Sequence, residues 1–327
     1  MTGIIGLAWR SLMNRRGSAL LTILAVALSV ALFLGVDKAR HGARAGFDNT
    51  ISGTDLIVGA PTGQINLLLY SVFRLGNATA EISWDTYEAI DGRDDIAWTI
   101  PVSLGDSHRG FRVLGTNDSY FEHYKHGEGQ ALKLAEGRRF SDIYEAVIGA
   151  EVARDLGYGL GSEIVLTHGL GAGGLTDHEN RPFIVSGILA PTGTPVDRTI
   201  HIPLEGVTAI HVGWESGTRN PMADTITDEM IRSFDLTPKS VTAVFAGLTD
   251  RRSLLRTQRA LNTRAGEPLL AIIPGIALGE LWQVTGIVER ALIAVSVFVI
   301  AVGLVSVLTS ILTSLKERRR EMSILRA

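Results

Sequence analysis

An uncharged apolar segment close to the end of the sequence limits the possible folds more than any other feature. It is ALIAVSVFVIAVGLVSVLTSILTSL, 25 residues from Ala291 to Leu315, between Arg290 and Lys316. As an α-helix it is about 37 Å long, enough to cross a hydrocarbon layer of about 30 Å. A core helix of a soluble protein rarely extends so far without a polar face. The segment therefore predicts a transmembrane helix over residues 291–315.

The charged segment KERRREMSILRA follows directly and fills residues 316–327. Five basic residues stand there against two glutamates, and Lys and Arg beside a span mark its cytoplasmic side. We therefore expect a charged helix in the cytoplasm, continuous with the span. A run of charges is usually a solvated surface. Here the apolar Met322, Ile324 and Leu325 also suit the segment to a groove on a cytoplasmic partner.

The N-terminal residues predict a second membrane-associated region. Residues 1–17 have the pattern of an amphipathic helix that lies in the membrane interface, and the alternative is the basic region of a signal sequence. Residues 18–36 are uncharged and longer than the apolar region of most cleaved signals. We therefore predict an uncleaved first transmembrane helix over 18–36, with its N-terminus inside. Basic residues flanking the two spans are more frequent on the proposed inside than outside.

Small residues recur at four-residue spacing in both predicted spans. Such stripes allow membrane helices to approach closely, although Ala and Ser are common in any membrane helix. The candidate helix-packing residues are Ala27, Ala31 and Gly35 in the first span and Ser306, Ser310 and Ser314 in the second.

The 37–290 segment between the spans is predicted to be exported and folded. Its ends, 37–50 and 277–290, look like helical continuations of the spans and form a predicted stalk. Two strand–helix–strand patterns, in about 51–105 and 238–274, predict one α+β lobe close to the membrane. The Gly- and Pro-rich stretch of about 106–237 contains short strand patterns and predicts a second, mainly β lobe inserted between them.

Composition and motifs exclude several classes of function. The net charge is -3, with 31 basic and 34 acidic residues, so a nucleic-acid partner is not indicated. The chain has no cysteine, which excludes disulfides and thiolate chemistry. No phosphate-binding GxxxxGK[ST] loop occurs, and the GLGAGG at Gly169–Gly174 is not followed by a helix pattern. No catalytic or cofactor-binding residue is predicted.

The eight histidines leave one metal hypothesis open. His123 and His126 form an HxxH pattern, and four more histidines occur around the predicted β lobe. No HExxH or similar ligand run is present. Ordinary hydrogen-bonded histidines are the preferred interpretation, with a zinc or copper site as the alternative.

Four stretches of the chain resemble the MacB/FtsX-type ABC transporter permeases. LAWRSLMNRRGSALLTILAVALSVALFLGV is similar to the family's elbow helix and first span. EAVIGAEVARDLGYGLGSEIVL and FIVSGILAPTGTPVDRTIHIPL resemble parts of its periplasmic core, and SILTSLKERRREMSILRA resembles the end of its second span with the coupling segment. Family members continue with two more spans, so the resemblance implies that this chain is truncated after its second transmembrane helix.

The resemblance implies a membrane protein with two transmembrane α-helices, a helical stalk and an α+β two-lobed periplasmic domain. It also implies a non-catalytic permease subunit in the bacterial inner membrane, driven by a separate ABC ATPase. The expected partners are that ATPase, a second permease in a homodimer or pair, the lipid bilayer, and a periplasmic adaptor or cargo protein. The implied ATPase-coupling residues are Glu317, Arg318, Arg319, Arg320, Glu321, Ile324, Leu325 and Arg326.

A two-span sensory receptor with an exported ligand-binding domain is the competing hypothesis. A receptor needs a cytoplasmic signalling region after residue 327, whereas a permease needs further hydrophobic spans. The sequence does not identify the cargo, for which export, lipoprotein release and regulation of a periplasmic partner all remain open.

Overall fold

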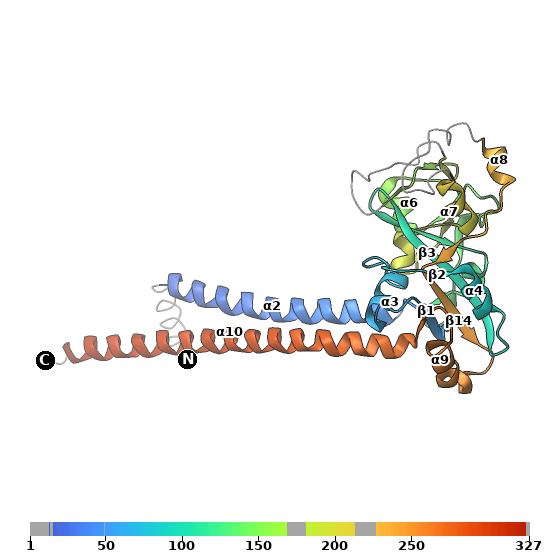
Figure 1. Ribbon diagram of the computed structural model, residues 1–327. Coiled ribbons are helices and arrows are strands. Elements are labelled where there is room, and N and C mark those ends of the chain that lie inside the picture. Colours follow the sequence, from blue (N-terminus) through green and yellow to red (C-terminus); the bar gives the residue numbers. More distant parts are fainter. Residues whose placement is uncertain (1–12, 14–15, 49, 169–180, 213–226, 325–327) are drawn as a thin grey trace. The chain divides into compact units, whose positions relative to one another are not determined.

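The computed structural model describes residues 13, 16–48, 50–168, 181–212 and 227–324 (Figure 1). The chain divides into two compact units, one made of Met1–Arg44 with Trp282–Ala327 and the other of Ala45–Leu281. Almost all of the predicted amphipathic helix over 1–17 lies outside the described residues. The first unit consists of the greater parts of two long helices, and the second contains every strand described here.

The two long helices are α2 (Arg16–Asp48), of 33 residues, and α10 (Pro274–Ile324), of 51 residues. Each is helical through a predicted span and into the adjoining predicted stalk end. The spans and the stalk themselves stay predictions. Pro274 is the first residue of α10 and no proline follows within it, so the backbone hydrogen bonds of the helix are not interrupted.

One helical segment in the described part of the chain has the length and hydropathy of a membrane span. It is Pro274–Val305 of α10, whose most apolar 18-residue window has a mean hydropathy of 2.3 and is not buried. This segment overlaps the predicted second span. The predicted first span over 18–36 is helical, and its position in a membrane stays a prediction.

The second unit, which we call the head, contains fifteen described strands and seven described α-helices. The strands are β1 (Leu56–Gly59), β2 (Ile82–Ser83), β3 (Ile96–His108), β4 (Phe111–Thr116), β5 (Lys125–His126), β6 (Gln130–Ala131), β7 (Leu134–Gly137), β8 (Glu145–Ile148), β9 (Glu163–Ile164), β10 (Thr167–His168), β11 (Phe183–Leu189), β12 (Thr199–Pro203), β13 (Ser240–Val241), β14 (Ala243–Leu248) and β15 (Leu270–Ile272). The helices are α3 (Gln64–Ser71), α4 (Trp84–Asp91), α5 (Ser119–His123), α6 (Ala150–Leu156), α7 (Leu204–His211), α8 (Asp228–Arg232) and α9 (Leu254–Asn262), with the 3-10 turns η1 (Pro195–Arg198) and η3 (Arg251–Ser253).

An 11-stranded mixed sheet organises the described residues of the head. Its main path is β15-β1-β14-β3-β4-β12-β8-β11-β7, with β10 paired to β3 and β9 paired to β11. The 13-residue strand β3 pairs with β14 from Ile96 to Val102 and with β4 from Ser103 to His108. Figure 1 shows β3 as the long strand that crosses the head. The two predicted strand–helix–strand units do pair, through β1, β14 and β3.

Hydrophobic side chains cover both faces of the sheet. In β14, Ala243 and Phe245 belong to a first core cluster, which packs under α3 and α5. The alternate residues Val244 and Ala246 belong to a second cluster, which packs under α4 and α9. A third cluster lies between the strands β4, β8, β11 and β12 and the helices α6, α7 and α8. Burial on both faces explains why β14 is apolar throughout instead of alternating.

The two predicted lobes are two regions of one continuous sheet. The second and third core clusters come mainly from the two predicted lobes, whereas the first cluster includes residues of both. Residues Ala45–Leu281 form one unit because β3 belongs to both regions. The region predicted to be mainly β also contains helices, and its AEVARDL segment forms α6. Helix-forming residues and a left-handed Gly157 (φ 68°) at its C-terminus account for α6.

His201 is a buried polar residue whose ring packs against Tyr120 and Phe121 of the first core cluster. Its side chain is 0% exposed, and its Nδ1–H donates to the Val147 carbonyl at 3.1 Å. Burial, together with the positive charge of Arg74, lowers the pKa of His201 to about 3. The imidazole is therefore neutral in the folded protein at every pH above about 4.

This neutral histidine predicts a specific loss of stability in acid. Below pH 6.5 the unfolded chain binds a proton at His201 that the folded chain does not, so the unfolding free energy falls by about 1.4 kcal/mol per pH unit from this group alone, until about pH 3. A His201→Phe variant should lose less stability than wild type between pH 6.5 and 4 in denaturant titrations. Parallel pH profiles for the two proteins would contradict this explanation.

Candidate functional site

The junction between the sheet and α10 is the first part of the candidate site. The edge strand β15 ends at Ile272, and α10 begins at Pro274. The carbonyl of Ile273 accepts hydrogen bonds from the backbone N–H of Ile276 at 3.0 Å and of Ala277 at 3.1 Å. The Ala277 side chain is 0% exposed and belongs to the first core cluster. Burial of this first turn therefore fixes the start of α10 to the head.

A side-chain contact supports the second turn of α10. Gln64, the first residue of α3, donates from Nε2 to Glu280 Oε1 at 3.4 Å. Leu278 packs partly buried against the first core cluster. Sequence reasoning missed this contact, because Gln64 and Glu280 are 216 positions apart and neither belongs to a recognisable motif.

The predicted coupling residues lie at the other end of α10. The backbone from Glu317 to Ile324 is helical, and the side chain of Arg319 is exposed. Leu325 and Arg326 are outside the described residues. One unbroken helix therefore joins the buried turn at Ala277 to the charged segment. The role of the predicted coupling residues in ATPase coupling stays a prediction.

The predicted packing stripes lie on helices, as their spacing requires. Ala27, Ala31 and Gly35 are exposed on α2, and a methyl group added at Gly35 meets no atom within 4 Å. Ser306, Ser310 and Ser314 lie within α10. The role of these residues in helix packing stays a prediction.

Two threonines in the apolar part of α10 satisfy their hydroxyl groups within the helix. Thr309 Oγ1 donates to the Val305 carbonyl and Thr313 Oγ1 to the Thr309 carbonyl, each at 2.8 Å. Internal hydrogen bonds of this kind are what a hydrocarbon environment requires of a polar group. These two threonines of the second predicted span are therefore compatible with lipid.

A pocket of about 640 Å³ lies on the head where the second and third core clusters meet. Strands β3 and β4 line one side, α7 lines another, and the segment Phe234–Ser240 lines a third. The volume is in the range typical of small-molecule sites. Carboxylates of Glu81, Asp106 and Asp235 line it together with Lys239. Its residues come from separate segments of the chain, so no spacing pattern in the sequence could reveal it.

The histidines are dispersed over the described residues. His108 donates from Nδ1 to the Val165 carbonyl at 2.6 Å and contacts the Tyr158 hydroxyl through Nε2 at 2.8 Å. His123 stacks on Trp98 with ring centroids 5.0 Å apart. Among the described residues no three His, Cys, Asp or Glu side chains gather as metal ligands, and His178 lies outside them. The alternative of a zinc or copper site therefore gains no support there.

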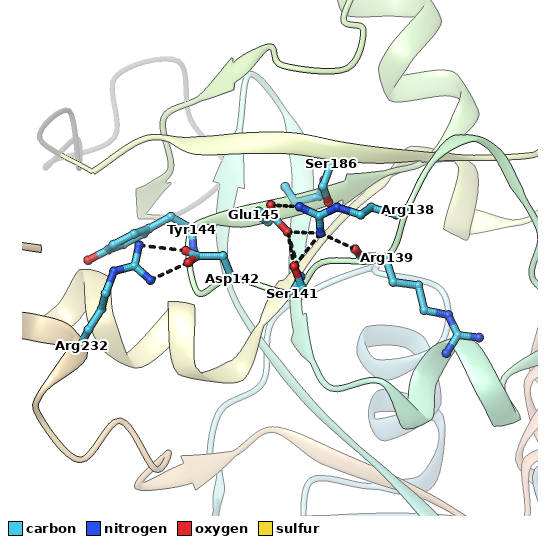
Figure 2. Close-up of polar contacts among 9 residues, drawn as sticks. Arg138, Arg139, Ser141, Asp142, Tyr144, Glu145, Ser186 and Arg232 are labelled. Atoms are coloured by element: carbon cyan, nitrogen blue, oxygen red, sulfur yellow. Dashed lines mark hydrogen bonds and ion pairs between the residues drawn. The ribbon is translucent and has the colours of Figure 1, made fainter. Parts of the chain in front are cut away.

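Two arginine–carboxylate pairs involve the β7–β8 connection (Figure 2). Arg138–Glu145 links its two ends, and Arg232–Asp142 links it to α8. Arg138 binds both oxygens of Glu145, one of them at 2.7 Å from Nη1. Arg232 of α8 binds Asp142 through two hydrogen bonds, at 2.5 and 3.0 Å, and lies 5.6 Å from the Tyr144 ring centre. Hydrogen bonds from the two guanidinium groups hold the pKa values of Glu145 and Asp142 below their usual range.

These two pairs are structural contacts on the surface of the head. Each arginine forms a planar, two-bond contact with its carboxylate, which fixes orientation better than a single bond. Arg232–Asp142 connects α8 with a segment 90 positions earlier in the chain. The sequence contains no catalytic signal at these positions, and the geometry assigns them a positioning role.

The family of the chain is decided by comparison with known proteins. The model of MacB-like periplasmic core domains matches residues 19–262, about three quarters of the sequence. The chain belongs to this family. The resemblance inferred from the four sequence stretches is thus confirmed. A comparison with curated proteins finds no match.

Two solved structures are similar to the chain. The periplasmic region of MacB from Actinobacillus actinomycetemcomitans is 11% identical with a TM-score of 0.42, covering 71% of this chain and 94% of that one. The extracellular domain of the noncanonic ABC-type transporter YknZ from Gram-positive bacteria is 14% identical with a TM-score of 0.37, covering 67% and 99%.

The Arg232–Asp142 contact predicts a local effect on α8. Arg232→Met removes both hydrogen bonds, and an exposed pair of this kind contributes about 0.2–1 kcal/mol. Amide hydrogen exchange in residues 227–236 should become about 1.4- to fivefold faster, with the core strands unaffected. The matched control is Arg252→Met, an exposed arginine in η3, which should leave that exchange unchanged. Equal rates in the two variants would exclude a positioning role.

Proposed function

We propose that the chain is the permease subunit of an ABC transporter and that it transmits motion rather than forming a pore. A separate ATPase binds the charged end of α10 on the cytoplasmic side and dimerises on ATP. The resulting displacement of the Glu317–Arg326 segment passes along α10 to the head. The head, in the periplasm, then acts on cargo or on a partner protein.

The observation that carries this proposal is the continuity of α10. A single 51-residue helix joins the sheet edge at β15 to the charged segment. At 1.5 Å per residue such a helix is about 76 Å long, with a backbone hydrogen-bonded from end to end. A displacement applied at its last turns is therefore transferred along the axis instead of being absorbed in a loop. Membership in the family of MacB-like periplasmic core domains supports the same assignment.

The chemistry of the charged segment suits docking to a protein groove. The basic residues at 318–320 lie towards the C-terminal end of α10, where the helix dipole favours positive charge. Ile324 and Leu325 provide apolar area for a groove, while Glu317 and Glu321 orient the contact. The proposed docking surface thus combines apolar anchoring with charge complementarity.

The wider setting follows from the same assignment. The proposed location is the bacterial inner membrane, crossed by the 18–36 and 291–315 segments, with the head in the periplasm. A second permease copy pairs with this one, and the stripes of small residues at Ala27, Ala31, Gly35, Ser306, Ser310 and Ser314 are the candidate packing faces. Export, lipoprotein release and regulation of a periplasmic partner are the candidate tasks. The receptor alternative is not favoured, because the matched family is that of MacB-like periplasmic core domains.

Continuity of α10 can be tested by breaking the helix. Gly286→Pro removes a backbone N–H and places a ring against the preceding turn, which kinks or breaks a helix. ATPase binding should be retained, whereas coupled turnover should fall by about tenfold or more, the loss of about 1.4 kcal/mol of coupling free energy. The measurements are copurification of the ATPase and nucleotide hydrolysis stimulated through the head.

The matched control at the same position is Gly286→Ala. A methyl group there meets no atom within 4 Å, and alanine favours helix over glycine. This variant should keep or improve coupled turnover. If the proline variant couples as well as the alanine variant, α10 does not act as the transmitting element.

The docking surface can be tested at the other end of the helix. Replacing Glu321 and Arg326 together by Ala removes charges that orient the contact, so coupled ATP hydrolysis should fall by about tenfold while the thermal unfolding of the head is unchanged. Arg252→Ala in η3 is the control and should have no effect. If neither complex formation nor coupled turnover changes in the double variant, the ATPase binds elsewhere.

A further inference from the structure

The pocket of about 640 Å³ in the head is not used by the proposed coupling mechanism. The apolar part of its lining consists mainly of Val113 on β4 and of Leu204 and Val207 on α7. Val113 and Leu204 are each 2% exposed, so the packed core holds them in place. A methyl group added at Gly115 would lie 2.5 Å from Val207 Cγ2, which shows how closely α7 packs on β4. This apolar wall is therefore preformed.

A β-bulge in β3 brings a carboxylate to the same pocket. The register with β4 shifts between Leu104 and Ser107, so that Gly105 and Asp106 stand opposite the single residue Val113. Bulges of this kind redirect side chains and are frequent beside functional sites. Gly105 and Asp106 both line the pocket, and Asp106 is only 5% exposed. A carboxylate at that depth is stabilised by a positively charged neighbour.

Two further carboxylates line the pocket from other segments of the chain. The exposed Glu81 accepts a hydrogen bond from Ser240 Oγ, 159 positions later. Asp235 Oδ1 accepts a hydrogen bond from the backbone N–H of Thr237 at 3.0 Å, and hydrogen bonds from Thr237 hold the pKa of Asp235 below its usual range. Among the described lining residues, Lys239 is the only lysine or arginine. Negative charge is therefore in excess in the pocket.

The pocket is open beside the bulge and large enough for an organic molecule. A methyl group built on Gly105 meets no atom within 4 Å, so the space next to Asp106 is not filled by protein. The volume exceeds what a metal ion needs and lies in the range of small-molecule sites. No group of three His, Cys, Asp or Glu side chains within the described residues is arranged to hold a metal ion. The size and chemistry of the lining thus favour an organic ligand.

We propose that this pocket binds a small organic cation, an amine with an apolar body. Its ammonium group lies near Asp106, where the carboxylates attract it, and its apolar body lies against Val113, Leu204 and Val207. Binding of such an amine requires neither the ATPase nor movement of α10. A failure of this proposal would therefore leave the proposed permease function untouched.

The first test measures binding by isothermal titration calorimetry, using the whole chain in a nonionic detergent and subtracting titrations into detergent alone. The probe is 4-phenylbutylamine, a cation at neutral pH, and the reference is 4-phenylbutan-1-ol, its uncharged analogue of the same shape. The amine should bind about tenfold more tightly or better, because only the amine is attracted by the carboxylates. Absence of amine binding, or equal Kd values for the two compounds, overturns the proposal.

Charge variants locate the ammonium group. Asp106→Asn preserves shape and should weaken amine binding about tenfold without changing the affinity for the alcohol. Lys239→Met removes a repelling charge and should strengthen amine binding about two- to fivefold. The control is Asp94→Asn, an exposed carboxylate outside the pocket lining, which should change neither affinity.

An unchanged amine affinity in Asp106→Asn contradicts the assignment. If that variant does not fold, Glu81→Gln combined with Asp235→Asn provides the second measurement, because both side chains are exposed. The double variant should also lose about tenfold in amine affinity and retain the affinity for the alcohol. Equal amine binding by the double variant and wild type would likewise exclude the site.

A space-filling variant tests whether the ligand occupies this pocket. Gly105 does not have a left-handed backbone conformation, so Gly105→Leu can fill the open space without backbone strain. It should abolish binding of both the amine and the alcohol. The matched control is Gly159→Leu, at another glycine with no atom within 4 Å of an added methyl group and outside the pocket lining, which should bind both normally. If Gly105→Leu binds both compounds like wild type, the ligand lies elsewhere and the proposal is wrong.

Discussion

The buried first turn of α10 is the constraint on which the proposed mechanism depends. Ala277 is fully enclosed in the first core cluster, and the Ile273 carbonyl accepts two hydrogen bonds from the turn that follows. From there the helix continues to Ile324 without a proline or a break. The helix therefore cannot rotate or slide at its start without disturbing the core. If a flexible loop followed β15 instead, it would absorb movement of the helix, and that movement would not reach the sheet.

The sheet extends this constraint from its edge to its centre. Strand β15 pairs with β1, β1 pairs with β14, and β14 pairs with the first half of β3. The second half of β3 pairs with β4, which begins the β-rich region. Because both faces of β14 and its neighbours are covered by packed side chains, this ladder is protected from water. The pocket of about 640 Å³ lies beside the same β3–β4 junction, so a shift of β3 relative to α7 changes its lining directly.

The long helices and the paired strand–helix–strand units could be predicted because their signals are local. Uncharged runs identify α2 and α10, and apolar runs between Gly and Pro identify β1, β14 and β15. The order of strands could not be predicted in the same way. The first strand–helix–strand pattern ends at about residue 105, whereas β3 continues to His108 through pairing with β10 and β4. The pocket and the Gln64–Glu280 contact join distant segments, and pairings of that kind leave no trace in residue spacing.

The polar groups in the core show why burial alone does not determine charge. His201 is neutral in the core because imidazole releases its proton near neutral pH, and burial favours the uncharged form. Arginine has no comparable neutral form near physiological pH, so Arg74 must carry its charge into the same environment. Arg112 meets this requirement with carbonyl oxygens from a neighbouring loop, at 2.6 and 2.8 Å. Arg74 is equally buried, and its guanidinium group lowers the pKa of Tyr120 through a hydrogen bond to that hydroxyl, against a larger increase from burial. The head therefore accommodates two arginines of the same depth with different polar partners.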